Sequence, residues 1–133
     1  MSIAALIAWI VTAGGGFVLL GTWLARGGTR NSKLPAPVVF GHFAVAAAGL
    51  VLWIVYLVAD AAMLAWIAFA LLVVVALLGF TLFARWVPTY RARATSAGGD
   101  APAERSFPVA VVGAHGLVAA VTVVLVLLAA VSS

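Results

Sequence analysis

The sequence predicts an all-α integral membrane protein, built as an up-down bundle of four transmembrane helices. Of its 133 residues, 67% are hydrophobic and only 8% are charged, whereas a soluble domain is nearer half apolar and a quarter charged. The mean hydropathy is +1.30. A soluble fold of this size could not bury so much apolar surface, because small domains leave much of their surface exposed. The bilayer is therefore the expected solvent.

The first apolar run predicts a transmembrane helix over about residues 3–25. No charge interrupts it before Arg26, and about 20 apolar residues are enough to cross the hydrocarbon core. A signal peptide is the alternative. It fits less well, because no basic residue precedes the run and the run is longer than a signal-peptide core.

The second apolar run, Val38 to Ala84, contains Asp60 as its only charge. As one helix it would be about 70 Å long, more than twice the hydrocarbon thickness of about 30 Å. We therefore expect it to fold back at Asp60, with aspartate acting as the N-cap of the returning helix. This predicts helices over about 37–59 and about 61–85.

The last apolar run predicts a fourth helix over about 107–131, with Pro108 in the permissive first turn. The segment before it, about 87–106, is expected to be a flexible cytoplasmic loop, because Thr95–Glu104 is rich in alanine, glycine and serine. The whole chain, 1–133, is then a single transmembrane domain.

The charges predict the orientation of the bundle. All seven basic residues fall in the two connections expected on one side, and the other side has none. The positive-inside rule then places both termini outside the cytoplasm, in a multi-pass protein of the plasma membrane. The net charge of +4 follows from this topology, so it does not indicate a nucleic-acid partner. The basic residues are Arg26, Arg30, Lys33, Arg85, Arg91, Arg93 and Arg105.

Composition excludes several kinds of site. The chain has no cysteine, so it cannot form disulfides, thiolate metal sites, iron–sulfur clusters or a covalently attached c-type haem. Three acidic residues are too few for a chain of intramembrane proton carriers.

A weak internal repeat relates the two halves of the chain. Gly21 and Gly79 each lie shortly before the end of an odd-numbered helix, and Pro37 and Pro108 precede the only two histidines, His42 and His115. Aligning these segments requires gaps, so chance similarity is an alternative. A true repeat would place two helical hairpins around a pseudo-two-fold axis along the membrane normal.

The two histidines are the candidate site. His42 and His115 lie on helices that run in the same direction, roughly 8–10 Å from their starts at 1.5 Å per residue. In an up-down bundle the second and fourth helices are diagonal, so the two imidazoles can face each other at one depth. That arrangement suits the two axial ligands of a haem iron.

Glycines and arginines are expected around this site. Gly21 and Gly79 fall near the same depth on the other two helices, and glycine allows close approach of a flat cofactor. Arg26 and Arg85 could pair with haem propionates. Arginine at the cytoplasmic end of a transmembrane helix is, however, expected without any ligand.

Four helices, diagonal histidines and these glycines resemble the haem-binding core of membrane b-type cytochromes, over the whole chain. The resemblance implies one haem b ligated by His42 and His115, with electron transfer in a respiratory or quinone-linked complex. The sequence departs from cytochrome b, where each histidine-bearing helix carries two histidines and two haems are stacked. Here there is one per helix, so at most one such haem is implied.

Other interpretations remain open. Intramembrane histidines can simply hydrogen-bond across helices, and glycines can serve packing. The protein would then be a cofactor-free accessory subunit of a larger membrane complex. In either case the expected partners are the lipid bilayer and a larger membrane complex or further copies of the same chain. Zinc or copper is less expected, because two imidazoles are an incomplete ligand set for zinc. A small transporter, with the first helix broken at Gly14–Gly16, ranks last because no second helix is interrupted and no buried acid couples an ion.

Overall fold

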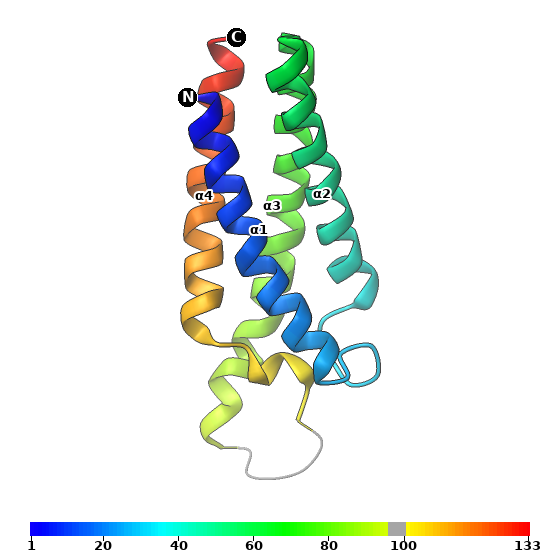
Figure 1. Cartoon of the computed structure of the whole chain (residues 1–133). Coiled ribbons are helices and arrows are strands. Elements are labelled where there is room, and N and C mark those ends of the chain that lie inside the picture. Colours follow the sequence, from blue (N-terminus) through cyan, green and yellow to red (C-terminus); the bar gives the residue numbers. More distant parts are fainter. Residues whose placement is uncertain (96–100) are drawn as a thin grey trace.

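The computed structural model describes residues 1–95 and 101–133 and consists of four long helices and two short ones, with no strand among these residues (Figure 1). The prediction of an all-α four-helix bundle is therefore confirmed. The long helices are α1 (Ser2–Ala25), α2 (Ala36–Ala59), α3 (Ala62–Arg91) and α4 (Val109–Val131), and the short 3-10 helices are η1 (Ala92–Ala94) and η2 (Ala103–Ser106).

The outer surface of the bundle is apolar and suited to contact with lipid. Each of the four long helices is long and apolar enough to cross a membrane. Large apolar side chains are exposed along them, including Val58 at 84%, Leu117 at 70% and Phe80 at 69%. Such a surface would be costly in water but costs little against acyl chains, so the chain is a multi-pass membrane protein.

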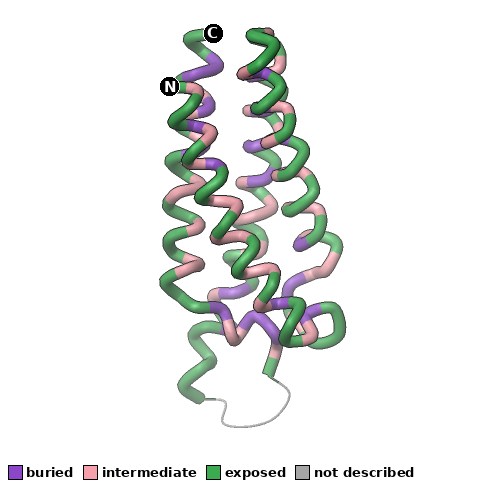
Figure 2. Tube along the Cα trace, in the orientation of Figure 1, coloured by how far each residue is buried: buried purple, intermediate pink, exposed green. Residues whose placement is uncertain are grey.

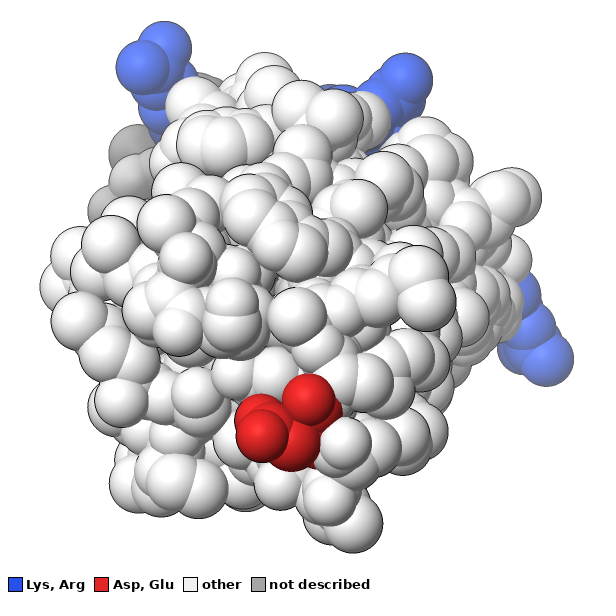
Figure 3. All heavy atoms as spheres, turned by 90° about the horizontal axis from the view of Figure 1, so that it is seen from above, with Lys and Arg blue, Asp and Glu red and all other residues white. Residues whose placement is uncertain are grey.

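The helices form a ring in which α2 packs mainly on α3 and α1 mainly on α4. Weaker contacts of α3 with α4 and of α1 with α2 close the ring, which leaves α2 diagonal to α4. Both termini and the α2–α3 turn lie at one end, which we call the terminus end, and the other two connections lie at the opposite loop end (Figure 1). Seen from the terminus end, the surface is uncharged apart from an acidic patch, and basic side chains appear only at the rim (Figure 3).

The α2–α3 turn corrects the role predicted for Asp60. Asp60 ends α2 in the left-handed conformation, with φ 50°, and its N–H donates to the carbonyl of Tyr56. The N-cap of α3 is Ala61 instead. A reversal this tight needs a residue at positive φ, and aspartate tolerates that conformation better than most side chains.

Helix α3 is longer than predicted. It continues past Arg85 to Arg91 and contains Pro88, although proline in a helix interior costs about 3 kcal/mol. Trp86 and Thr89, on either side of this proline, are buried, and that packing stabilises the extension. The segment expected as a flexible loop thus begins as helix and ends in the packed η2; residues 96–100 lie outside the described part of the chain.

The buried residues form two clusters, one toward each end of the bundle, with half-buried and exposed residues between them (Figure 2). The terminus-end cluster is centred on Trp9, Trp53, Tyr56, Leu72 and Val126. The loop-end cluster comprises Trp23, Leu34, Val39, Trp86, Ala103 and Phe107.

Between these clusters lies a layer that we call the histidine band. It consists of residues 10–22, 40–48, 76–85 and 108–121, none of which is buried. Every long helix contributes one segment to it. Among the described residues, the band is therefore a level of the bundle at which no buried side chain joins the four helices.

Candidate functional site: the paired histidines

The two histidines meet in the histidine band. His42 comes from α2 and His115 from the diagonal helix α4, and both are half-buried. Their ring centroids lie 6.3 Å apart and the rings are inclined at 65°, edge to face. The structure therefore brings together the two residues that the sequence placed at one depth.

Each imidazole is fixed by a carbonyl oxygen on the neighbouring helix. Nδ1 of His42 lies 3.0 Å from the carbonyl oxygen of Val75 in α3, and Nδ1 of His115 lies 2.8 Å from that of Thr12 in α1. A carbonyl oxygen can only accept, so Nδ1 carries the proton in both rings. Nε2 of each neutral ring is then left with its lone pair available to a ligand.

Glycines make room for these rings. A Cβ atom on Gly79 would lie 3.2 Å from Cε1 of His42, and one on Gly16 would lie 3.2 Å from Cε1 of His115. Gly15 is also close, with its Cβ 3.3 Å from Nδ1 of His115. All three separations are tighter than ordinary packing, so these glycines let an imidazole lie against the helix backbone.

Gly21, the other predicted glycine, does not contact the histidine rings. Gly21 is exposed, and a Cβ atom there would meet nothing within 4 Å. The glycines that α1 contributes are Gly15 and Gly16, which the gapped alignment missed. The missed signal was the identical spacing from glycine to tryptophan in Gly16…Trp23 and Gly79…Trp86.

The internal repeat holds in three dimensions and needs no gap within a helix, although the connection between the two helices is longer in the second half. In each half, the first helix supplies a carbonyl, a glycine and a tryptophan at the same spacing, and the second supplies a proline N-cap and then a histidine. The corresponding pairs are Thr12 and Val75, Gly16 and Gly79, Trp23 and Trp86, Pro35 and Pro108, and His42 and His115. The site is thus assembled from two equivalent halves.

The predicted arginines lie away from the histidines. Arg26 is the exposed C-cap residue of α1. Arg85 is also exposed, and its Nη1 lies 3.5 Å from the carbonyl oxygen of Lys33. Neither arginine forms a hydrogen bond with the imidazoles. Both lie at the helix ends that also carry the tryptophans of the loop-end cluster. Their positions match the charged boundary of a membrane helix.

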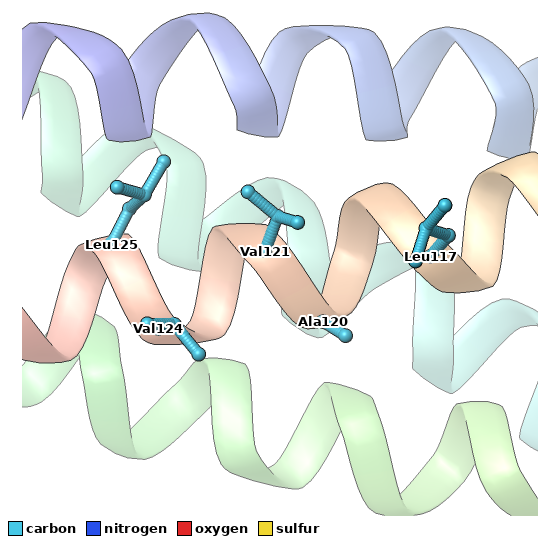
Figure 4. A pocket seen from close by; sticks show the side chains of 5 residues that line it. All are labelled: Leu117, Ala120, Val121, Val124 and Leu125. Atoms are coloured by element: carbon cyan, nitrogen blue, oxygen red, sulfur yellow. The ribbon is translucent and has the colours of Figure 1, made fainter.

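A groove on the lipid side of α4 is not a chemical site. It has a volume of ≈ 280 Å³ and runs along α4 from Leu117 to Leu125 (Figure 4). Only apolar side chains line it: Leu117, Ala120, Val121, Val124 and Leu125. With no polar group to orient a ligand, it can hold an acyl chain but cannot select a substrate.

One charged residue near the loop end was missed by the sequence analysis. Glu104 in η2 is fully buried, although its segment has the composition of a loop. Nothing in the local sequence distinguishes it from a solvated glutamate, because its partners come from the distant α1–α2 connection.

Neither a metal site nor a similar protein accounts for the histidine pair. Among the described residues, no group of three or more histidine, aspartate or glutamate side chains could hold a bare metal ion. No protein-family model, curated protein or solved structure matches the chain. The chemistry of the site therefore has to be argued from its geometry.

Proposed function

We propose that this protein is a small membrane b-type cytochrome, with one haem b held by His42 and His115 and used for electron transfer. The observation that carries the proposal is the pair of Nδ1 hydrogen bonds to Val75 and Thr12. Metal-binding histidines typically donate their other ring nitrogen in this way, which fixes the tautomer and the orientation of the ring. Two such histidines, one from each side of the same layer, make a matched pair of axial ligands.

The separation of the rings fits this role. Imidazole nitrogens bind metals at about 2.0–2.1 Å, so two axial rings on one metal have their centroids about 6 Å apart. The observed distance between the centroids is 6.3 Å. The spacing of the two rings would therefore suit two imidazoles that bind one haem iron.

Small residues next to the histidines leave room for a flat cofactor. Gly15, Gly16 and Gly79 lie against the rings, and Ala46 and Ala119 are half-buried four residues after His42 and His115. Larger residues at these positions would fill the layer with side chains. The proposed ligands therefore come from two helices, and small side chains at the same level come from all four.

The ligand set suits electron transfer. A haem with two histidine ligands supplies one-electron redox chemistry with no open coordination position for oxygen. The residues of this chain orient the imidazoles, and the two buried clusters limit access of water from either end. We further propose that the protein serves as a subunit of a respiratory or quinone-linked complex of the plasma membrane, with the basic loop end in the cytoplasm and both termini outside.

The test is a reduced-minus-oxidised optical spectrum of detergent-purified protein produced with ample haem. A low-spin b-type signal is expected in the unchanged protein and in Leu117→Ala, a control on the exposed face of α4. The signal should be absent from both His42→Ala and His115→Ala. A folded protein without any haem signal would contradict the proposal.

A second function is favoured by the same hydrogen bonds. They join α2 to α3 and α4 to α1, so the imidazoles have a complete structural role without a cofactor. The protein would then be a cofactor-free accessory subunit of a larger membrane complex. A flat spectrum together with stable co-purification of a defined membrane complex would support this alternative.

A further inference from the structure

Helix α3 departs from the repeat beyond its tryptophan. In the first half of the chain, α1 ends at Ala25, two residues after Trp23. In the second half, α3 continues to Arg91, five residues after Trp86, and η1 follows directly. The end of α3 therefore projects beyond the other long helices (Figure 1). This extension takes no part in the histidine pair, because the carbonyl, the glycine and the tryptophan of the repeat all precede it.

The extension carries positive charge that no carboxylate of the described residues offsets. Arg91 and Arg93 are both exposed. The acidic side chains in the described part of the chain are Asp60, at the terminus end, and Glu104, which is buried and bonded to the α1–α2 connection. Neither forms an ion pair with Arg91 or Arg93. An anion from outside the chain could therefore bind them.

Aromatic rings hold one of these arginines in place. The ring of Tyr90 lies against that of Trp86, with centroids 5.0 Å apart and planes inclined at 30°. The guanidinium of Arg93 lies 5.4 Å from the centre of the Tyr90 ring, within the range of cation–π attraction. Trp86 is buried in the loop-end cluster, so this stack ties Arg93 to the packed end of the bundle. A contact with a ring face uses none of the guanidinium N–H groups, which can still donate to an anion.

A further guanidinium lies beside Arg93. Helix η2 packs on α3, and Nη2 of its Arg105 donates to the carbonyl oxygen of Arg93 at 3.2 Å. The guanidinium group is planar and presents several N–H groups in a fixed fork, which matches the oxygens of a phosphate. The end of α3 therefore offers the side chains that are best suited to a phosphate group.

The position of these arginines along α3 matches the layer of lipid headgroups. No charge interrupts α3 from Ala62 to Ala84, a length of about 33 Å at 1.5 Å per residue, close to the hydrocarbon thickness of about 30 Å. Arg91 follows Arg85 by roughly 9 Å, and the headgroups occupy about 5–8 Å on each side of the hydrocarbon core. Long arginine side chains can reach across the small difference.

We propose that the end of α3 is a binding site for an anionic phospholipid. Arg91 and Arg93 hold the headgroup phosphate, with Arg105 beside them. The acyl chains lie along the apolar surface one turn below, where exposed Phe83 contacts Trp86 with ring centroids 5.8 Å apart. A zwitterionic lipid binds less well, because its ammonium group is repelled by the arginines, and a free phosphate ion lacks the acyl chains. The site is independent of whatever the histidines bind, so it does not depend on the proposed haem.

The test measures lipid binding by the full chain in detergent micelles with native mass spectrometry, which counts the lipids bound to each protein. The probes are phosphatidylglycerol and phosphatidylcholine with identical acyl chains, so only the headgroup differs. The unchanged protein should bind phosphatidylglycerol more tightly. Arg93→Ala should lower that preference about fivefold, as expected for one basic residue at an anionic lipid surface, and the double variant Arg91→Ala/Arg93→Ala should lower it further.

Matched variants locate the site. Arg26→Ala/Arg30→Ala removes the same number of charges from the other connection of the loop end and should keep most of the preference. Tyr90→Ala should lower the preference about two- to fivefold, as expected for the loss of a cation–π contact at an exposed site. Tyr90→Phe keeps the ring face and should behave like the unchanged protein.

Several results would overturn the proposal. Equal affinity for the two lipids would exclude a site for an anionic headgroup. An equal loss of preference in both double variants would show a general effect of charge, and a preference kept without Arg91 and Arg93 would leave these arginines to an acidic soluble partner. Displacement of phosphatidylglycerol by an equal concentration of inorganic phosphate would show that the site recognises free phosphate. If the Arg91→Ala/Arg93→Ala protein fails to fold, equal preferences in Tyr90→Ala and Tyr90→Phe would contradict the proposal.

Discussion

The imidazole rings of His42 and His115 meet edge to face, with centroids 6.3 Å apart, and each is fixed by a carbonyl of a different helix pair. His42 belongs to the α2–α3 pair and His115 to the α1–α4 pair. The α2–α3 pair and the α1–α4 pair of helices therefore meet at these rings.

Replacing His42 by leucine should lower the free energy of unfolding. The change removes the bond from Nδ1 to the carbonyl of Val75, and side-chain hydrogen bonds between membrane helices are worth about 0.6 kcal/mol on average and up to about 1.7. Denaturant titration in micelles measures the loss. Thr22→Val is the control, because Thr22 is half-buried near the helix end and bonds only to the carbonyl of Val18 in its own helix. An equal loss of unfolding free energy in both variants would show that the bond between helices contributes no more than a bond within one helix.

Leucine at Gly79 should disturb the bundle, and leucine at Gly21 should not. A Cβ at Gly79 already lies 3.2 Å from His42, whereas Gly21 faces open space. Overpacking typically costs about 1–3 kcal/mol, so Gly79→Leu and its equivalent Gly16→Leu should unfold at distinctly lower temperature. Thermal unfolding followed by circular dichroism tests this. Equal tolerance at all three positions would contradict the assigned contacts.

The indole N–H groups of the loop-end cluster should contribute to stability. Trp86→Phe keeps an aromatic ring but loses the bond to the Glu104 carbonyl, and Trp23→Phe loses the bond to Ser32. Each loss should cost about 1 kcal/mol. Trp66→Phe, at an exposed position, should change little. Chemical denaturation of the three variants measures the differences, and a cost in Trp66→Phe equal to the others would count against these two bonds.

Labelling from outside intact cells should mark the terminus end. Asp60→Cys lies at the α2–α3 turn and Arg30→Cys at the loop end. Because basic connections are retained in the cytoplasm, an impermeant maleimide should label Asp60→Cys in intact cells and Arg30→Cys only after the membrane is permeabilised. The reverse pattern would show that the orientation is inverted.

The sequence predicted the helices well, because about 20 apolar residues have few alternatives in a chain of this composition. It predicted their ends less well, because ends depend on tertiary contacts. The burial of Trp86 and Thr89 carries α3 past Pro88. Asp60 marked the fold-back correctly but was assigned to the wrong helix, since aspartate suits both an N-cap and a left-handed C-cap.

The candidate site was predicted in part. The equal depth of His42 and His115 follows from helix rise, and Gly79 does lie against His42. Gly21 does not contact either ring, because the distance of a residue from a charged helix end does not fix which face of the helix it occupies. The tryptophan spacing that identifies Gly16 is visible in the sequence. The partners of Glu104 are not, because they come from a connection far away along the chain.

Whether the histidines hold a haem is decided by the reduced-minus-oxidised spectrum of the purified protein and of the two histidine variants. We expect a low-spin b-type signal that is lost when either His42 or His115 becomes alanine, while Leu117→Ala retains it. Equal dependence on both residues follows from their equivalent positions in the repeat. A folded, haem-supplied protein with no signal, or a signal that survives both alanine variants, would contradict it.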